Sequence, residues 1–280
     1  MLTGILYQVI SMCSFGTGNV LWKVPQKSFS VAKIIVLRTS VSVLLFGSIA
    51  LYQCDYVGTP YDWLLATLIS AVSFLGLLFY NKSIKESTVS HSITITSTSA
   101  LFGVITSIIF YNESITWSLL LALFMIVSGL FLIEGKKPVI NWSKGTLYAI
   151  LASFFWGTTF ALFKIPVNKI GDVNFSLVLE STVLICSFLI FMSQRKIPNT
   201  HKPTVRTYMF ILILGVLGFI GVIFYNKAVQ IVDVSKLSVL GAFTPVITIC
   251  IAHLWLKEKF KLWQYVGMIL TILAVFLLAF

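Results

Sequence analysis

Long apolar segments alternate with short polar ones along the whole chain of 280 residues. The apolar segments lie at about 2–22, 31–52, 62–81, 87–111, 114–134, 143–163, 172–193, 206–227, 233–256 and 261–280. Roughly 20 mostly apolar residues are enough for one helix to cross a bilayer. The pattern therefore predicts an all-α membrane protein with about ten transmembrane helices, and it leaves too few residues for a soluble domain.

The composition supports this class and removes one alternative. The chain is 58% hydrophobic and 10% charged, whereas about a quarter of the residues in a typical globular domain are charged. The net charge of +11 would suggest nucleic-acid binding in a soluble protein. Membrane proteins concentrate lysine and arginine in their loops, so we expect the lipid bilayer as a partner and no nucleic acid.

The basic residues are distributed unevenly between alternate loops. Fifteen lie in or beside the loops after the first, third, fifth, seventh and ninth spans: Lys23, Lys27, Lys33, Lys82, Lys85, Lys136, Lys137, Lys144, Arg195, Lys196, Lys202, Arg206, Lys257, Lys259 and Lys261. The opposite loops carry four, which are Lys164, Lys169, Lys227 and Lys236. The positive-inside rule places the first set in the cytoplasm and both termini outside it. The first apolar segment has no basic region before it, so we expect a span rather than a signal peptide.

One polar pentapeptide occurs twice, as FYNKS at 79–83 and as FYNKA at 224–228. The same shift of 145 positions relates Glu113 to Glu258. We therefore expect two five-helix repeats, at residues 1–134 and 143–280, joined by a linker at 135–142. Because five is odd, the second repeat enters the bilayer from the opposite side. Inverted repeats of this kind are typical of secondary transporters that work by alternating access.

The stretch 221–280 resembles the second repeat of EamA-type carriers in the drug/metabolite transporter superfamily. The matching features over the whole chain are Gly16, Arg38, the pair Trp156 and Gly157, Ala228 after a polar turn, Pro245 in mid-helix, Glu258 at a helix end, and Gln264 with Gly267. Two residues depart from the pattern, because Ala100 stands where a proline is expected and Glu180 stands near the place of an arginine.

The resemblance covers essentially the whole chain and has consequences for fold and function. It implies a ten-helix bundle with a central cavity lined mainly by spans one, three, four, six, eight and nine. It implies export or exchange of small metabolites such as amino acids. We expect the protein in the bacterial inner (plasma) membrane.

The fourth span, 87–111, is the least apolar, with hydroxyl or imidazole side chains at ten positions between 87 and 99. Its alternation resembles a strand, but lipid cannot satisfy an open strand edge, so we expect a helix. Such a polar helix either forms a wall facing the substrate or uses its hydroxyls for helix packing. We take His91, Thr94 and Thr98 as cavity candidates.

The ninth span, 233–256, is the counterpart of the fourth in the second repeat, and it offers Ser238 and Thr244 as cavity candidates. Pro245 lacks a backbone N–H and predicts a helix kink. The kink either frees the Gly241 carbonyl for a neighbour or a ligand, or only shapes the bundle.

Two charged residues lie well inside expected spans, at nearly equivalent places in the two repeats: Arg38 in span two and Glu180 in span seven. Charges within a membrane are costly and are usually paired or exposed to water. The pair either changes its protonation or pairing during transport, or it anchors the helices at the interface or as a static ion pair.

Aromatic and amide side chains that can hold an organic solute are Asn19, Tyr80, Asn81, Trp156, Tyr225 and Asn226. Aromatic faces bind apolar or cationic groups, and an amide is both donor and acceptor. Tyrosine and tryptophan also gather at membrane interfaces. For Tyr80 and Tyr225, which lie at span ends, the sequence favours an interface belt, and a place in the cavity is the other interpretation.

Enzymes and ATP-driven pumps find no support in the sequence. All four aspartates lie in loops or at span ends, and neither HExxH nor GxxxxGK[ST] occurs. We therefore expect no enzyme, no ATP-driven pump, no catalytic residues, no metal and no cofactor. The prediction is a monomeric secondary transporter that exports an amino acid or a related small metabolite. The alternatives are an uptake or exchange carrier for a larger metabolite, such as a nucleotide-like or sulfonium compound, and a channel.

Overall fold

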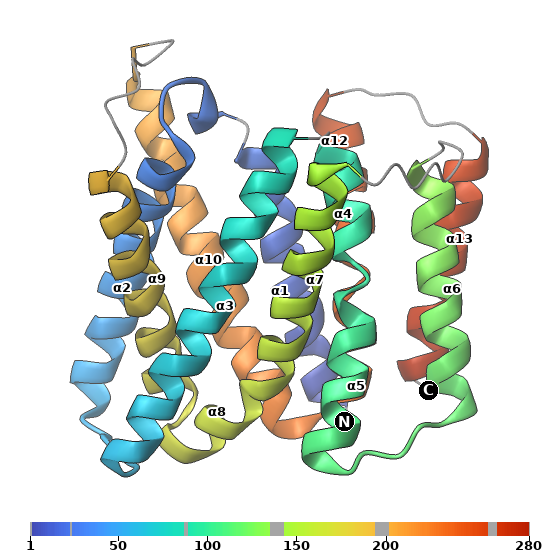
Figure 1. Ribbon diagram of the computed structural model, residues 1–280, viewed down its shortest axis with the longest axis horizontal. Coiled ribbons are helices and arrows are strands. Elements are labelled where there is room, and N and C mark those ends of the chain that lie inside the picture. The colour runs from blue at the N-terminus through green and yellow to red at the C-terminus, as the bar shows by residue number, and fades with distance from the viewer. Residues whose placement is uncertain are drawn as a thin grey trace.

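The computed structural model describes residues 2–22, 24–86, 89–134, 143–193, 202–256 and 262–279. Over these residues the chain forms thirteen α-helices, one 3-10 helix and no strand, packed side by side in a bundle (Figure 1). The first half holds α1 (Leu2–Leu21), η1 (Pro25–Lys27), α2 (Val31–Gln53), α3 (Pro60–Glu86), α4 (Val89–Thr96), α5 (Ser99–Tyr111) and α6 (Trp117–Glu134). The second half holds α7 (Lys144–Leu162), α8 (Lys164–Ile170), α9 (Asp172–Ser193), α10 (Val205–Ile231), α11 (Val234–Gly241), α12 (Thr244–Leu256) and α13 (Leu262–Ala279).

The helices have the length and the outer surface of membrane spans. Among the residues that the structure describes, five segments are long and apolar enough to cross a bilayer: Val31–Gln53, Pro60–Ile84, Lys144–Ile170, Asp172–Ser193 and Val205–Ile231. Shorter apolar helices cover Ser99–Tyr111, Trp117–Leu132, Val234–Thr248 and Leu262–Ala274. Leu44, Phe124 and Leu189 are among many large apolar side chains that are exposed, as expected for helices that face lipid. The chain is an integral membrane protein, as the sequence predicted, while the count of ten spans stays a prediction.

Several helices begin where local sequence favours a start. The Ser30 hydroxyl accepts a hydrogen bond from the Lys33 amide at 3.4 Å, and the Ser143 hydroxyl accepts one from the Thr146 amide at 3.2 Å. Thr204 opens α10 with a reciprocal capping box. Serine and threonine at these positions satisfy amides that have no partner within the helix, so α2, α7 and α10 start at defined residues.

The fourth and ninth expected spans are each divided in two, whereas the sequence predicted continuous helices. α4 ends at Thr96 and α5 begins at Ser99, while α11 ends at Gly241 and α12 begins at Thr244. Pro245 is the second residue of α12, where a missing N–H is tolerated because the first amides of a helix have no intrahelical partner. The kink predicted from Pro245 is thus a full break just before it.

The break in the first half forms without a proline. The Ser97 hydroxyl donates to the Ile93 carbonyl and the Thr98 hydroxyl donates to the Ile95 carbonyl, each at 2.7 Å. Hydroxyls that bond to nearby carbonyls compete with the amides of the helix. The two halves therefore break at equivalent places. The break lies within a run of hydroxyl side chains in the first half and just before Pro245 in the second.

The helices follow the same order in both halves, with η1 in the place of α8. α3 packs against α7 as α10 packs against α1, and α2 packs against its counterpart α9. α6 likewise packs against its counterpart α13. Contacts between the halves are therefore largely reciprocal.

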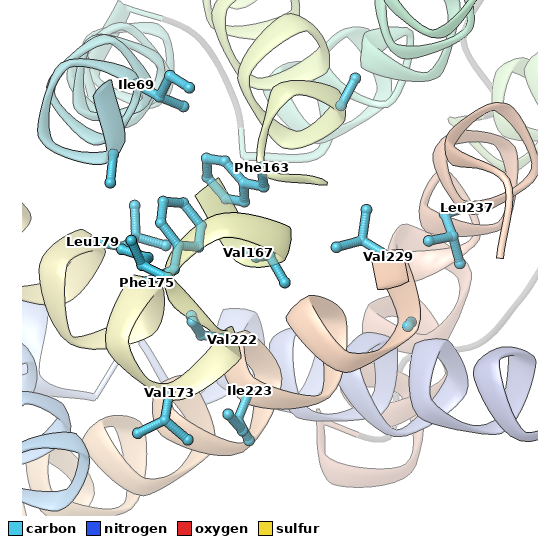
Figure 2. Packing of buried hydrophobic residues seen from close by; sticks show 14 of the residues in the cluster. Ile69, Phe163, Val167, Val173, Phe175, Leu179, Val222, Ile223, Val229 and Leu237 are labelled. Atoms are coloured by element: carbon cyan, nitrogen blue, oxygen red, sulfur yellow. The ribbon is translucent and has the colours of Figure 1, made fainter. Parts of the chain in front are cut away.

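The bundle has an η1 end, where α1 stops and α2 starts, and an α8 end at the lower edge of Figure 1. A large apolar cluster fills the α8 end and includes Val167, Phe175 and Val229 (Figure 2). The rings of Phe163 and Phe175 lie edge to face with centroids 4.9 Å apart. This cluster joins α8 to the ends of its neighbours and closes the bundle there.

Candidate functional site

A cavity of about 360 Å³ is lined by residues of both halves. Its lining includes Phe163 and Leu237, which also belong to the apolar cluster at the α8 end. In the other direction the lining extends to Gln26 in η1 and to Ile84 near the end of α3. The cavity is therefore floored at the α8 end and reaches the η1 end.

All six spans that the sequence predicted to line a cavity do so, as α1, α3, the α4–α5 break, α7, α10 and the α11–α12 break. The long helices α2 and α9 also contribute, α2 through Arg38 and α9 through Leu179, Glu180 and Val183, and η1 contributes Gln26. Because α2 and α9 are long apolar helices, the only sign in the sequence that they line the cavity was one charged residue within each span.

A polar face of α1 lies along the cavity and was only partly anticipated. The Ser11 hydroxyl donates to the Gly221 carbonyl at 2.8 Å, and the Gln8 amide donates to the Leu237 carbonyl at 3.4 Å. The Asn19 amide donates to the Thr248 hydroxyl of α12 at 3.3 Å. Gln8 and Ser11 were not among the predicted cavity residues, although the spacing of residues 8, 11, 15 and 19 places them on one helical face.

Aromatic side chains form a second wall. The Trp156 ring lies 5.0 Å from the Tyr80 ring and is stacked on Phe160 with centroids 6.2 Å apart. Gly76 makes room for it, because a Cβ there would lie 2.7 Å from the indole Nε1. The Tyr225 hydroxyl donates to the Phe160 carbonyl at 2.9 Å. Tyr80 and Tyr225, the tyrosines of the two FYNK motifs, therefore line the cavity rather than forming a belt at the membrane interface.

Arg38 and Glu180 are the charged residues among the described cavity lining. The Arg38 guanidinium lies 5.7 Å from the centre of the Trp22 ring and close against Gly218. Glu180 is 3% exposed, and its Oε2 and the Arg38 Nε are buried without a hydrogen-bond partner. The two opposite charges line the same cavity. Their unpaired atoms leave capacity for a polar ligand, because buried polar groups are normally hydrogen-bonded.

The two helix breaks bring backbone and hydroxyl groups to the cavity. Ser97 and Ser99 line it from the first half, and Ser238 and Thr244 line it from the second. The Gly241 carbonyl, which Pro245 was expected to free, accepts a hydrogen bond from the Thr244 hydroxyl at 2.7 Å. That carbonyl therefore has a hydrogen-bond partner within the protein.

Most of the side chains predicted from the sequence meet in this one cavity. Those that line it are Asn19, Arg38, Tyr80, Asn81, Trp156, Glu180, Tyr225, Asn226, Ser238, Thr244 and Pro245. Thr98 is not among them, and its hydroxyl shares a hydrogen bond of 2.9 Å with Ser153 on α7. The side chains of His91 and Thr94 lie outside the described residues. Within the part of the chain that the structure describes, no three His, Cys, Asp or Glu side chains gather as metal ligands.

Three proteins are similar to this chain in sequence. An uncharacterized transporter of Archaeoglobus fulgidus is 24% identical over 253 residues, which cover 86% of this chain and 85% of the relative. The uncharacterized transporter YoaV of Bacillus subtilis is 29% identical over 126 residues, 45% of this chain and 42% of the relative. An uncharacterized protein of Haemophilus influenzae is 21% identical over 283 residues, covering 95% and 94%.

One protein of known crystal structure has the same fold, with a TM-score of 0.79 over 97% of this chain and 95% of that protein. Its sequence is 13% identical, so the likeness concerns the fold alone. The model of the EamA-like transporter family matches residues 2–135 and again residues 143–280. With both halves matched, the chain belongs to the EamA-like transporter family, as the resemblance of its sequence predicted.

Proposed function

We propose that the protein is a secondary carrier that exports a small organic metabolite, an amino acid or a related compound, by alternating access. The observation that carries this proposal is the central cavity, which is floored by an apolar cluster at the α8 end and reaches the η1 end. A binding site that is closed on one side only is what one state of an alternating-access carrier requires. The export direction is taken from the family resemblance.

Reciprocal contacts support two inverted repeats. Gly157 in α7 lies against the Ser99 carbonyl at the start of α5, and Gly16 in α1 lies close to the Thr244 carbonyl at the start of α12. Residues 99 and 244 are related by the shift of 145 positions, and residues 16 and 157 by a shift of 141, which carries Gly16-Thr17 onto Gly157-Thr158. Each half therefore presents the same contact to the other. A two-fold relation gives this reciprocity, and an odd number of spans per repeat puts its axis in the membrane plane.

The distribution of basic residues supports an orientation for this state. The loop that contains η1 belongs to the lysine-rich set, which the positive-inside rule assigns to the cytoplasm. The η1 end is then the cytoplasmic end, and the cavity faces inward. The α8 end is extracytoplasmic and must open for the solute to leave.

The size and lining of the cavity favour a small solute. Its volume of about 360 Å³ lies near the lower limit of typical ligand sites, which hold roughly 300–1,000 Å³. The lining carries one cation and one anion, and its other polar groups are uncharged amides, hydroxyls and aromatic side chains. These properties favour an amino-acid-sized compound over the larger nucleotide-like or sulfonium alternative, and a multiply charged phosphate would lack sufficient cations.

The proposal can be tested with purified protein in liposomes. Vesicles preloaded with one candidate metabolite should accumulate the labelled compound by counterflow, with saturation. Trp156→Ala should reduce this exchange, whereas Leu189→Ala on the exposed outer face should not, because only Trp156 lines the cavity. Flux that neither saturates nor shows counterflow would favour a channel, and absence of flux for a broad metabolite panel would refute the assignment.

A further inference from the structure

The carboxylate of Glu113 holds the start of a helix from the other half of the molecule. Glu113 follows α5, and its Oε1 and Oε2 accept hydrogen bonds from the backbone amides of Val234 and Ser235, each at 2.8 Å. These amides begin α11. A carboxylate at a helix N-terminus satisfies amides that have no intrahelical partner and complements the helix dipole.

The same carboxylate is tied to the junction of α7 and α8. Lys164 Nζ lies 4.0 Å from Glu113 Oε1 and 5.3 Å from the centre of the Tyr111 ring. The Tyr111 hydroxyl donates to the Ala161 carbonyl at 2.9 Å. Tyr111 and Glu113, with Lys164 and the amides of residues 234 and 235, form what we call the Glu113 clamp. The clamp joins the first half to two elements of the second half.

The clamp stands beside the apolar floor of the cavity. Val234 and Leu237 in α11 are fully buried and belong to the cluster that closes the α8 end. Leu237 also lines the cavity. Any opening of the α8 end that moves the start of α11 away from α5 must break both carboxylate hydrogen bonds and expose these side chains.

We propose that Glu113 is the positioning residue of a gate at the α8 end, and that release of its two bonds to α11 accompanies opening of the cavity on that side. This rests on the proposed function, because alternating access requires the α8 end to open. Glu113 is not part of the cavity lining. It sets how often the closed state gives way to the open one.

Accessibility of residue 234 tests the gate directly. In a protein whose native cysteines have been replaced, Val234→Cys keeps the backbone amide that Glu113 binds. A membrane-impermeant maleimide is applied to intact cells and to inside-out vesicles. Residue 234 should react slowly with Glu113 present, and Glu113→Ala and Glu113→Gln should speed labelling from the α8 side about tenfold, because two charge-assisted hydrogen bonds are weakened or lost.

Asp62→Asn is the matched control. The Asp62 carboxylate accepts hydrogen bonds from the amide and the hydroxyl of Thr59, at 2.8 and 2.7 Å, so its hydrogen bonds lie within its own segment. The gate is supported if maleimide labelling of residue 234 is faster in both Glu113 variants and unchanged in Asp62→Asn. Equal labelling rates in all variants overturn the proposal. Faster labelling from both membrane sides, together with a lowered unfolding midpoint, also overturns it, because it indicates a general loss of stability. Failure of the carrier assignment itself is seen separately, as absence of solute counterflow in the parental protein.

Discussion

Gly157→Ala should destabilise the protein through a helix crossing beside the cavity. Gly157 lies in α7, where it meets the first turn of α5. A Cβ there would meet the Ser99 carbonyl oxygen and lie 2.7 Å from the Phe102 Cβ. Carbon atoms pack best at about 3.5–4.0 Å, so the two helices would have to separate by about 1 Å.

The magnitude follows from two opposing effects. Overpacking of a dense interior costs about 1–3 kcal/mol, and a backbone atom cannot turn aside as a flexible side chain can. Alanine in place of a helical glycine contributes about 1 kcal/mol in favour of the helix. We expect the packing effect to prevail, because the contact involves the backbone of α5, and the net loss to be about 1–2 kcal/mol. Solute affinity should also fall, because Trp156 is the neighbouring residue.

Gly47→Ala is the matched control. Gly47 is also in a helix, but a Cβ there would have nothing within 4 Å. The same propensity gain of about 1 kcal/mol should then appear alone, as a slightly raised midpoint of thermal unfolding in detergent. A Gly157→Ala protein as stable as Gly47→Ala, with unchanged solute affinity, would refute the claim that this glycine permits the crossing.

Three further predictions concern the cavity and its surroundings. Trp156→Ala removes the ring between Tyr80 and Phe160 and should weaken solute binding about tenfold, measured by ligand-dependent thermal shift. Arg38→Met alone should lower the unfolding midpoint more than Arg38→Met combined with Glu180→Gln, since the single variant leaves a buried carboxylate without its opposite charge. An equal loss in the two proteins would show that the charges are independent. Thr98→Ala should cost about 1 kcal/mol of stability through its lost hydrogen bond and leave the Kd of the solute unchanged, a result that reduced affinity would contradict.

Much of the cavity could be predicted from single residue types. Trp156, Asn226 and Glu180 are conspicuous because large polar or charged side chains are rare in apolar spans. Gln8 and Ser11 lie on the same cavity, but glutamine and serine near the start of a span are also common in helix packing. Thr98 had the same signal as its neighbours and lies instead against Ser153, because a helix break rotates successive side chains by an amount that periodicity does not give.

The amino-acid sequence by itself determined the all-helical membrane character, because apolar length is a local property of the chain, and the resemblance of its residues to EamA-type carriers indicated the transporter family. Tertiary structure alone decided which end of the cavity is closed and which side chains close it. The structure brings together residues more than a hundred positions apart, such as Glu113 and Val234. It also divides two spans into separate helices, one beside a run of hydroxyl side chains and one just before Pro245. Packing across the two halves, rather than any local preference, places these groups together.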